Sequence, residues 1–132
     1  MAASSALPRV LVVDDEPANL NTFRRAFRKE LAVSVAHSGA EAVAALEAQR
    51  FDIVFVDFAM PHMSGVDVLE HARRIQPSAT RVLLTAYSDR PELHRAIKRG
   101  LAVALITKPW RRVEILELVE QDIAAQATGV EA

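Results

Sequence analysis

Residues 10–17 have the sequence VLVVDDEP, in which four consecutive apolar residues precede three acidic residues and a proline. The apolar run is too short for a buried helix and is typical of a strand that is covered on both faces. Three further runs of this kind occupy residues 53–56, 82–84 and 103–106. A fifth run, residues 32–36, has a serine in its middle, which favours an edge strand. The five runs together predict a parallel sheet.

Segments with helical spacing lie between these strands. Apolar residues recur every three or four positions in the first of them, at Leu20, Phe23, Phe27 and Leu31. Ser38 followed by Glu41 fits a capping box, and Ser64 followed by Asp67 resembles one with a shorter acid. Strand and helix alternate five times, which predicts a doubly wound α/β domain with a five-stranded parallel sheet and five helices.

The length of 132 residues suits one domain. We expect a flexible leader at residues 1–8, the domain at 9–126 and a tail or linker stub at 127–132. The absence of cysteine excludes disulfides, thiol chemistry and cysteine zinc sites. The chain has no secretory signal and no apolar run of the roughly 20 residues that span a membrane. A cytoplasmic protein is therefore predicted, and the net charge of −1 favours neither nucleic acid nor membrane as a partner.

Polar residues stand at the ends of four of the five strands: Asp14, Asp15, Asp57, Thr85 and Lys108. The carboxyl ends of parallel strands meet at one edge, where α/β proteins bind their ligands. Three neighbouring carboxylates repel one another unless a cation lies among them. An all-oxygen ligand set indicates Mg2+, for which Mn2+ could substitute.

A carboxylate beside a metal ion, a lysine and a hydroxyl group meets the requirements of phosphoryl transfer. Asp57 would be the nucleophile, and Lys108 and Thr85 would bind phosphoryl oxygens. Each residue taken alone also has a structural explanation. Asp14 or Asp15 could cap the first helix, and Lys108 could be a solvated residue after a strand. Their joint occurrence at successive strand ends favours the functional interpretation.

Over residues 9–126 the chain resembles the receiver domain of two-component response regulators, including chemotaxis-type members. The matching motifs are VLVVDDEP at 10–17, DFAMPHMSG at 57–65, LLTAY at 83–87 and TKPW at 107–110. The resemblance implies the strand order 2-1-3-4-5 and phosphorylation of Asp57 by a histidine kinase or a phosphotransfer protein. It also implies a switch that catalyses only its own phosphorylation and dephosphorylation.

By the same resemblance, Asp57, Asp15 and the Ala59 carbonyl would bind Mg2+ directly, and Asp14 would bind it through water. Residues that would support the site or the switch are Gly65, Ala86, Tyr87, Leu105 and Pro109. Neither Ala59 nor Tyr87 supplies an acid or amide to orient an attacking water, and the tyrosine ring could shield the phosphoryl group, so we expect slow self-dephosphorylation.

The chain departs from the family at Leu105, where receivers usually have an aromatic residue that reports phosphorylation. We expect that the output signal is weaker, uses Tyr87 or helix shifts instead, or depends on a partner that selects one state. The output surface would be the fourth helix, the fifth strand and the fifth helix. That strand lacks the acid of the salt-bridged dimers, so a protein partner is favoured over direct DNA binding, with a monomer or weak dimer in solution.

Two other functions are consistent with parts of the sequence. A Mg2+-dependent phosphatase of the haloacid-dehalogenase type also forms an aspartyl phosphate, but the chain offers Asp14-Asp15-Glu16 where that class has Asp-x-Asp. A docking module that a partner reads regardless of phosphorylation is suggested by Leu105.

Overall fold

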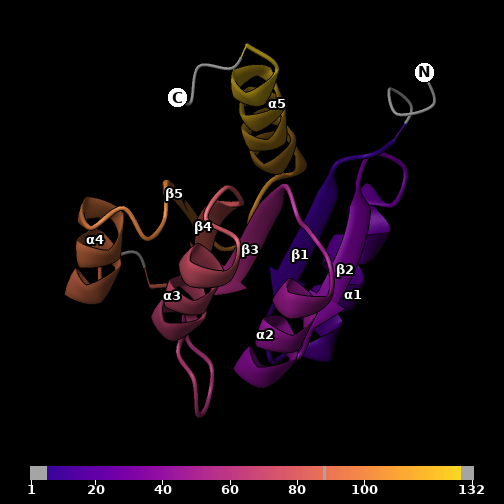
Figure 1. Ribbon diagram of the computed structural model, residues 1–132. Coiled ribbons are helices and arrows are strands. Elements are labelled where there is room, and N and C mark those ends of the chain that lie inside the picture. Colours follow the sequence, from indigo (N-terminus) through magenta and orange to yellow (C-terminus); the bar gives the residue numbers. More distant parts are fainter. Residues whose placement is uncertain (1–5, 88, 129–132) are drawn as a thin grey trace.

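Five strands and five helices alternate along the chain in this computed structural model, which describes residues 6–87 and 89–128 (Figure 1). The strands are β1 (Arg9–Val13), β2 (Ala32–Ala36), β3 (Ile53–Asp57), β4 (Thr80–Thr85) and β5 (Ala104–Thr107). The helices are α1 (Pro17–Phe27), α2 (Gly39–Ala48), α3 (Gly65–Ile75), α4 (Pro91–Lys98) and α5 (Arg112–Thr128). The predicted alternation of strand and helix is confirmed.

All strands are parallel, in the order β2-β1-β3-β4-β5, as the family resemblance implied. The chain leaves β1 for β2 on one side and later enters β3 on the other side of β1. The carboxyl ends of β1 and β3 therefore flank the point at which the strand order reverses, where doubly wound sheets bind ligands.

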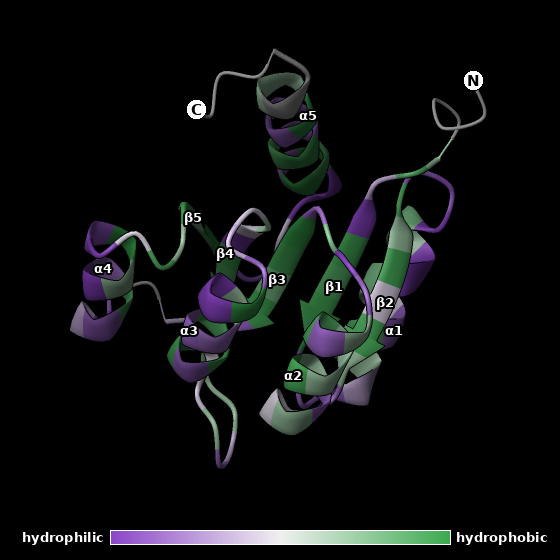
Figure 2. Cartoon of the chain, viewed as in Figure 1, coloured by the Kyte–Doolittle hydropathy of each residue, from purple (hydrophilic) through white to green (hydrophobic). Residues whose placement is uncertain are grey.

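Helices cover both faces of the sheet. The strands are among the most hydrophobic parts of the chain, as Figure 2 shows. One core layer lies between the sheet and α2, α3 and α4, and the other lies between the sheet and α1 and α5. In the second layer the rings of Phe23 and Phe27 lie 5.3 and 5.4 Å from the ring of Trp110. This aromatic cluster joins α1 to the segment between β5 and α5.

The helix starts differ in part from expectation. Ser64 and Asp67 form the complete capping box, because each side chain accepts a hydrogen bond from the other residue's backbone N–H. Ser38 accepts from the backbone N–H of Glu41 at 3.1 Å, but the Glu41 carboxylate accepts from His37 at 2.7 Å. The capping box predicted at Ser38 is therefore incomplete, because the glutamate bonds one residue further back.

Several strand boundaries differ from expectation, most clearly in the fourth and fifth strands. The fifth strand begins at Ala104, and Val103 before it is 63% exposed. The fourth strand begins at Thr80 and includes Arg81, which is buried. Its guanidinium donates to the carbonyls of Leu101 at 2.7 Å, and of Gly100 and Ala79 at 3.2 Å each. A charged residue thus enters the sheet because backbone carbonyls at helix ends satisfy its donors.

Helix α5 continues to Thr128, two residues past the predicted end of the domain. Most of the predicted leader and tail, residues 1–5 and 129–132, lies outside the described residues. Within the described chain, none of the helices is long and apolar enough to cross a membrane.

Candidate functional site

The sheet brings the five predicted strand-end residues to one edge. Asp57 and Thr85 are the last residues of β3 and β4. Asp14 follows β1, and its backbone N–H donates to a β2 carbonyl at 3.1 Å. Lys108 follows β5, and its backbone N–H donates to the Thr85 carbonyl at 2.8 Å. These bonds extend the sheet ladder beyond the strands, so the backbone that carries the site is held by the sheet.

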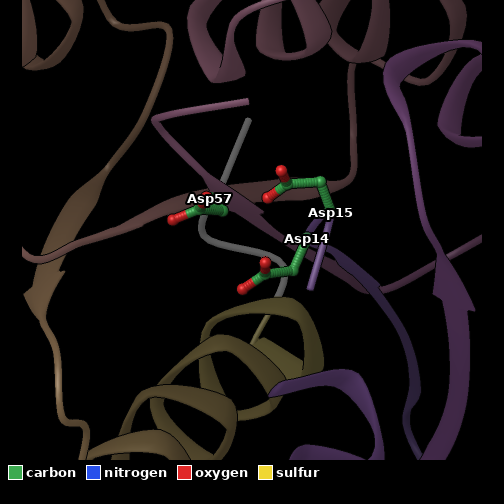
Figure 3. Close-up of side chains that lie close together, drawn as sticks. All are labelled: Asp14, Asp15 and Asp57. Carbon is green, nitrogen blue, oxygen red and sulfur yellow. The ribbon is translucent and has the colours of Figure 1, made fainter. Parts of the chain in front are cut away.

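Three carboxylates form a cluster at this edge. Figure 3 shows Asp14 and Asp15 at the end of β1 beside Asp57 at the end of β3. One carboxylate oxygen of each residue lies within 4.8 Å of the others. Asp14 and Asp57 are buried, at 2% and 7% exposure, whereas Asp15 is exposed. The cluster is thus open to solvent through Asp15.

Lys108 joins two of these carboxylates. Its ammonium nitrogen lies 2.9 Å from Oδ1 of Asp57 and 2.9 Å from Oδ2 of Asp14. Burial favours the neutral amine, but the hydrogen bonds to Asp14 and Asp57 outweigh it and raise the pKa of Lys108. The lysine is therefore a permanent cation at neutral pH. The Lys108–Pro109 peptide bond is cis.

Asp57 has an environment that disfavours its charge. Burial raises the pKa of Asp57 above its ordinary value, and the negative charges of Asp14 and Asp15 act in the same direction. The hydrogen bond and the charge of Lys108 act in the opposite direction without reversing the shift. A carboxylate with these neighbours gains from any further cation in the cluster.

Two further donors reach the cluster: one is a backbone N–H at the N-cap of α1, and the other is a side-chain amide in the first turn of α1. The backbone N–H of Glu16 donates to Oδ1 of Asp14 at 2.9 Å. The side-chain amide of Asn19 donates to Oδ2 of Asp14 at 3.2 Å. Sequence patterns did not indicate Asn19, since a polar residue in the first turn of a helix is ordinary. A spacing of five residues from Asp14 was the only available signal.

The residues expected to act in switching surround Thr85. Thr85 is buried, and its hydroxyl oxygen accepts from the backbone N–H of Tyr87 at 2.9 Å, so its own proton can be donated elsewhere. The ring of Tyr87 is 48% exposed and lies 5.0 Å from the guanidinium carbon of Arg90. Leu105 is half-buried and packs against the core layer that contains α4.

Three more of the expected residues shape the surroundings of the site. A Cβ atom on Gly65 would lie 2.4 Å from the carbonyl oxygen of Asp57, so the loop after β3 requires glycine here. Ala86 and Pro109 line a cavity of about 510 Å3 that also reaches Asp14 and Lys108. Ala59 is an exposed residue of the loop that joins β3 to α3.

The donor set fits a small hard cation. Oxygens that bind one Mg2+ lie about 3 to 4 Å apart, since each lies about 2.1 Å from the ion. The three carboxylate oxygens lie within 4.8 Å of one another, which is close to this range. The extra distance leaves room for a water molecule between the ion and one carboxylate. Carboxylates without sulfur or imidazole neighbours are the ligands that Mg2+ prefers.

A doubly wound parallel sheet with three carboxylates and a lysine at its switch point defines the class, which is an α/β domain with an acidic site at the carboxyl edge of the sheet. Residues 10–120 match the family model of the response regulator receiver domain. The chain belongs to this family.

Curated relatives agree with this membership. The hydrogenase transcriptional regulatory protein HoxA of Bradyrhizobium diazoefficiens is 29% identical over 86% of this chain and 24% of its own length. The response regulator receiver protein Anae109_2439 of Anaeromyxobacter is 35% identical over 83% of this chain and 46% of its own length. The chain spans about a quarter to a half of the length of these relatives.

Solved structures share the fold over nearly the whole chain. A CheY-like receiver domain protein from Methanospirillum hungatei has a TM-score of 0.87 and 26% identity, and covers 94% of this chain and 99% of its own. The response regulator TrrA of Thermotoga maritima, solved in complex with Mg(2+)-BeF, has a TM-score of 0.77 and 29% identity, and covers 88% and 99%.

Proposed function

We propose that this receiver domain is a phosphorylation switch, in which Asp57 accepts a phosphoryl group from a histidine kinase or a phosphotransfer protein. The observation that carries the proposal is the position of Lys108, 2.9 Å from both Asp57 and Asp14, within a cluster of three carboxylates. This arrangement provides a buried nucleophile, a fixed cation and an ion site within one crevice.

In the proposed reaction an oxygen of Asp57 attacks phosphorus, and the bond from phosphorus to the donor histidine breaks. The electron pair of that bond leaves with the imidazole, and the product is an aspartyl phosphate. Lys108 and the Thr85 hydroxyl bind phosphoryl oxygens. Asp57, Asp15 and the Ala59 carbonyl would hold Mg2+, and Asp14 would contact it through water. The bound ion would supply positive charge that offsets the negative charge developing on the phosphoryl group. The similar protein TrrA was solved with Mg(2+)-BeF, which supports this ion.

The output would pass through the surface formed by α4, β5 and α5. Large apolar side chains are exposed on or beside these elements, at Tyr87 (48%), Val103 (63%) and Val113 (47%). A protein partner that covers these elements would bury these side chains. We therefore propose a protein partner here. Since neither Ala59 nor Tyr87 supplies an acid or amide to orient water, the phosphoryl group should persist for minutes or longer.

Intact-mass spectrometry after incubation with acetyl phosphate and Mg2+ tests the proposal. We expect one phosphoryl adduct on the wild type and none on Asp57→Asn or in the presence of a chelator. A wild type that stays unmodified, under conditions that label another receiver domain, would contradict the proposal. A docking module that works without phosphorylation would then account better for the fold.

A further inference from the structure

An amide side chain from α1 reaches into the acidic cluster. Asn19, the third residue of α1, donates from Nδ2 to Oδ2 of Asp14 at 3.2 Å. Asn19 itself is exposed, while the carboxylate that it contacts belongs to a residue that is 2% exposed. The contact therefore links the helix surface to the most buried carboxylate of the cluster.

The carboxylate of Asp14 accepts hydrogen bonds from three donors, and phosphorylation would affect them differently. Oδ1 accepts from the backbone N–H of Glu16 at 2.9 Å, and Oδ2 accepts from Lys108 at 2.9 Å and from Asn19. A phosphoryl group on Asp57 would attract the lysine ammonium to its own oxygens. Of the two donors to Oδ2, Lys108 and Asn19, only Asn19 would then remain. A buried carboxylate that loses a donor is destabilised, so Lys108 can leave more readily when another donor remains.

We propose that Asn19 is a positioning residue, which orients the Asp14 carboxylate toward the ion site and keeps it hydrogen-bonded when Lys108 moves to the phosphoryl group. This inference rests on the proposed function, and it assigns to Asn19 a role that acts through Asp14. Partners behind a metal ligand orient it, and their loss commonly weakens metal binding about tenfold or more. Because Asn19 is exposed and its bond is long, we expect a smaller effect.

Asn19→Leu tests the role, because leucine has nearly the shape of asparagine and lacks the donor. Asn21→Leu is the matched control, since Asn21 is an exposed asparagine on the same helix. For Asn19→Leu we expect the Mg2+ dissociation constant from isothermal titration calorimetry to rise about threefold or more. Labelling by acetyl phosphate at saturating Mg2+ should slow by a similar factor, and the Tm should stay within about 2 °C of the wild type.

A conservative variant separates positioning from packing. Asn19→Gln keeps an amide donor and should lie closer to the wild type than Asn19→Leu in both measurements. If Asn19→Leu equals wild type and Asn21→Leu within about twofold in Mg2+ affinity and labelling rate, the inference is wrong while the proposed function stands. A wild type that is not labelled at all overturns the proposed function and this inference with it.

Discussion

Replacement of Gly65 by alanine should disturb the backbone that carries Asp57, the proposed phosphorylation site. The added Cβ would lie 2.4 Å from the Asp57 carbonyl oxygen and 2.8 Å from Cα of Phe58, where 3.4 Å or more is ordinary contact. The backbone must therefore move by about 1 Å, while the Gly65 N–H remains bonded to the Phe58 carbonyl at 2.9 Å. Overpacking against rigid atoms costs about 2–3 kcal/mol, which corresponds to a Tm lower by roughly 6–15 °C.

Circular dichroism melting curves would measure this loss, with Gly100→Ala as the control. Gly100 has a φ of 77°, and no described atom lies within 4 Å of its Cβ position, so alanine there costs about 1 kcal/mol from the backbone conformation alone. Labelling of Asp57 by acetyl phosphate should slow at least tenfold in Gly65→Ala, since a shift of about 1 Å misplaces the nucleophile. A Gly65→Ala protein that melts within about 2 °C of wild type and labels normally would refute this reasoning.

Two further predictions concern buried charges. Arg81→Met removes the donors to the carbonyls of Leu101, Gly100 and Ala79. In urea unfolding, the free energy of unfolding should fall by about 2–4 kcal/mol. An unchanged unfolding midpoint would contradict the role of Arg81 as the link between β4 and the end of α4. Asp57→Asn should be more stable than wild type at pH 7, because burial raises the pKa of the Asp57 carboxyl group in the folded state. A raised carboxyl pKa stabilises the folded state below the unfolded pKa, near pH 4, and this contribution is lost as pH rises through the folded pKa. The difference between the two proteins in urea titrations should therefore shrink toward pH 4, and a constant difference would show that burial of Asp57 is not its cause.

The fold was largely predictable because local sequence and the global arrangement agree. Runs such as residues 53–56 are apolar throughout, since helices cover both faces of a parallel sheet. The predictions failed where tertiary contacts decide the outcome. Val103 looks like a strand residue but is exposed. Arg81 looks like a loop residue but is buried, and two of the carbonyls that accept from it, those of Gly100 and Leu101, lie 19 and 20 residues further along the chain. No local pattern indicates such carbonyls.

The composition of the site was predictable, but its internal contacts were not. Successive strand ends at one edge require Asp14, Asp57 and Lys108 to lie close together. The spacing of these residues in the sequence does not show that Lys108 bridges both carboxylates. The bridge depends on the conformation of a flexible side chain, and Lys108 is 94 residues away from Asp14 in the sequence. Asn19 was missed for the same reason, since only the start of α1 relative to β1 brings its amide to Asp14.

The aromatic cluster of α1 gives the site a built-in optical probe. The chain has one tryptophan, Trp110, which stands two residues after Lys108 and lines the same cavity as Asp14. Its ring packs against Phe23 and Phe27, so its surroundings are defined by helix and site together. Tryptophan fluorescence therefore arises from this one position, and a change in this emission would follow movement of the lysine segment in real time without any attached label.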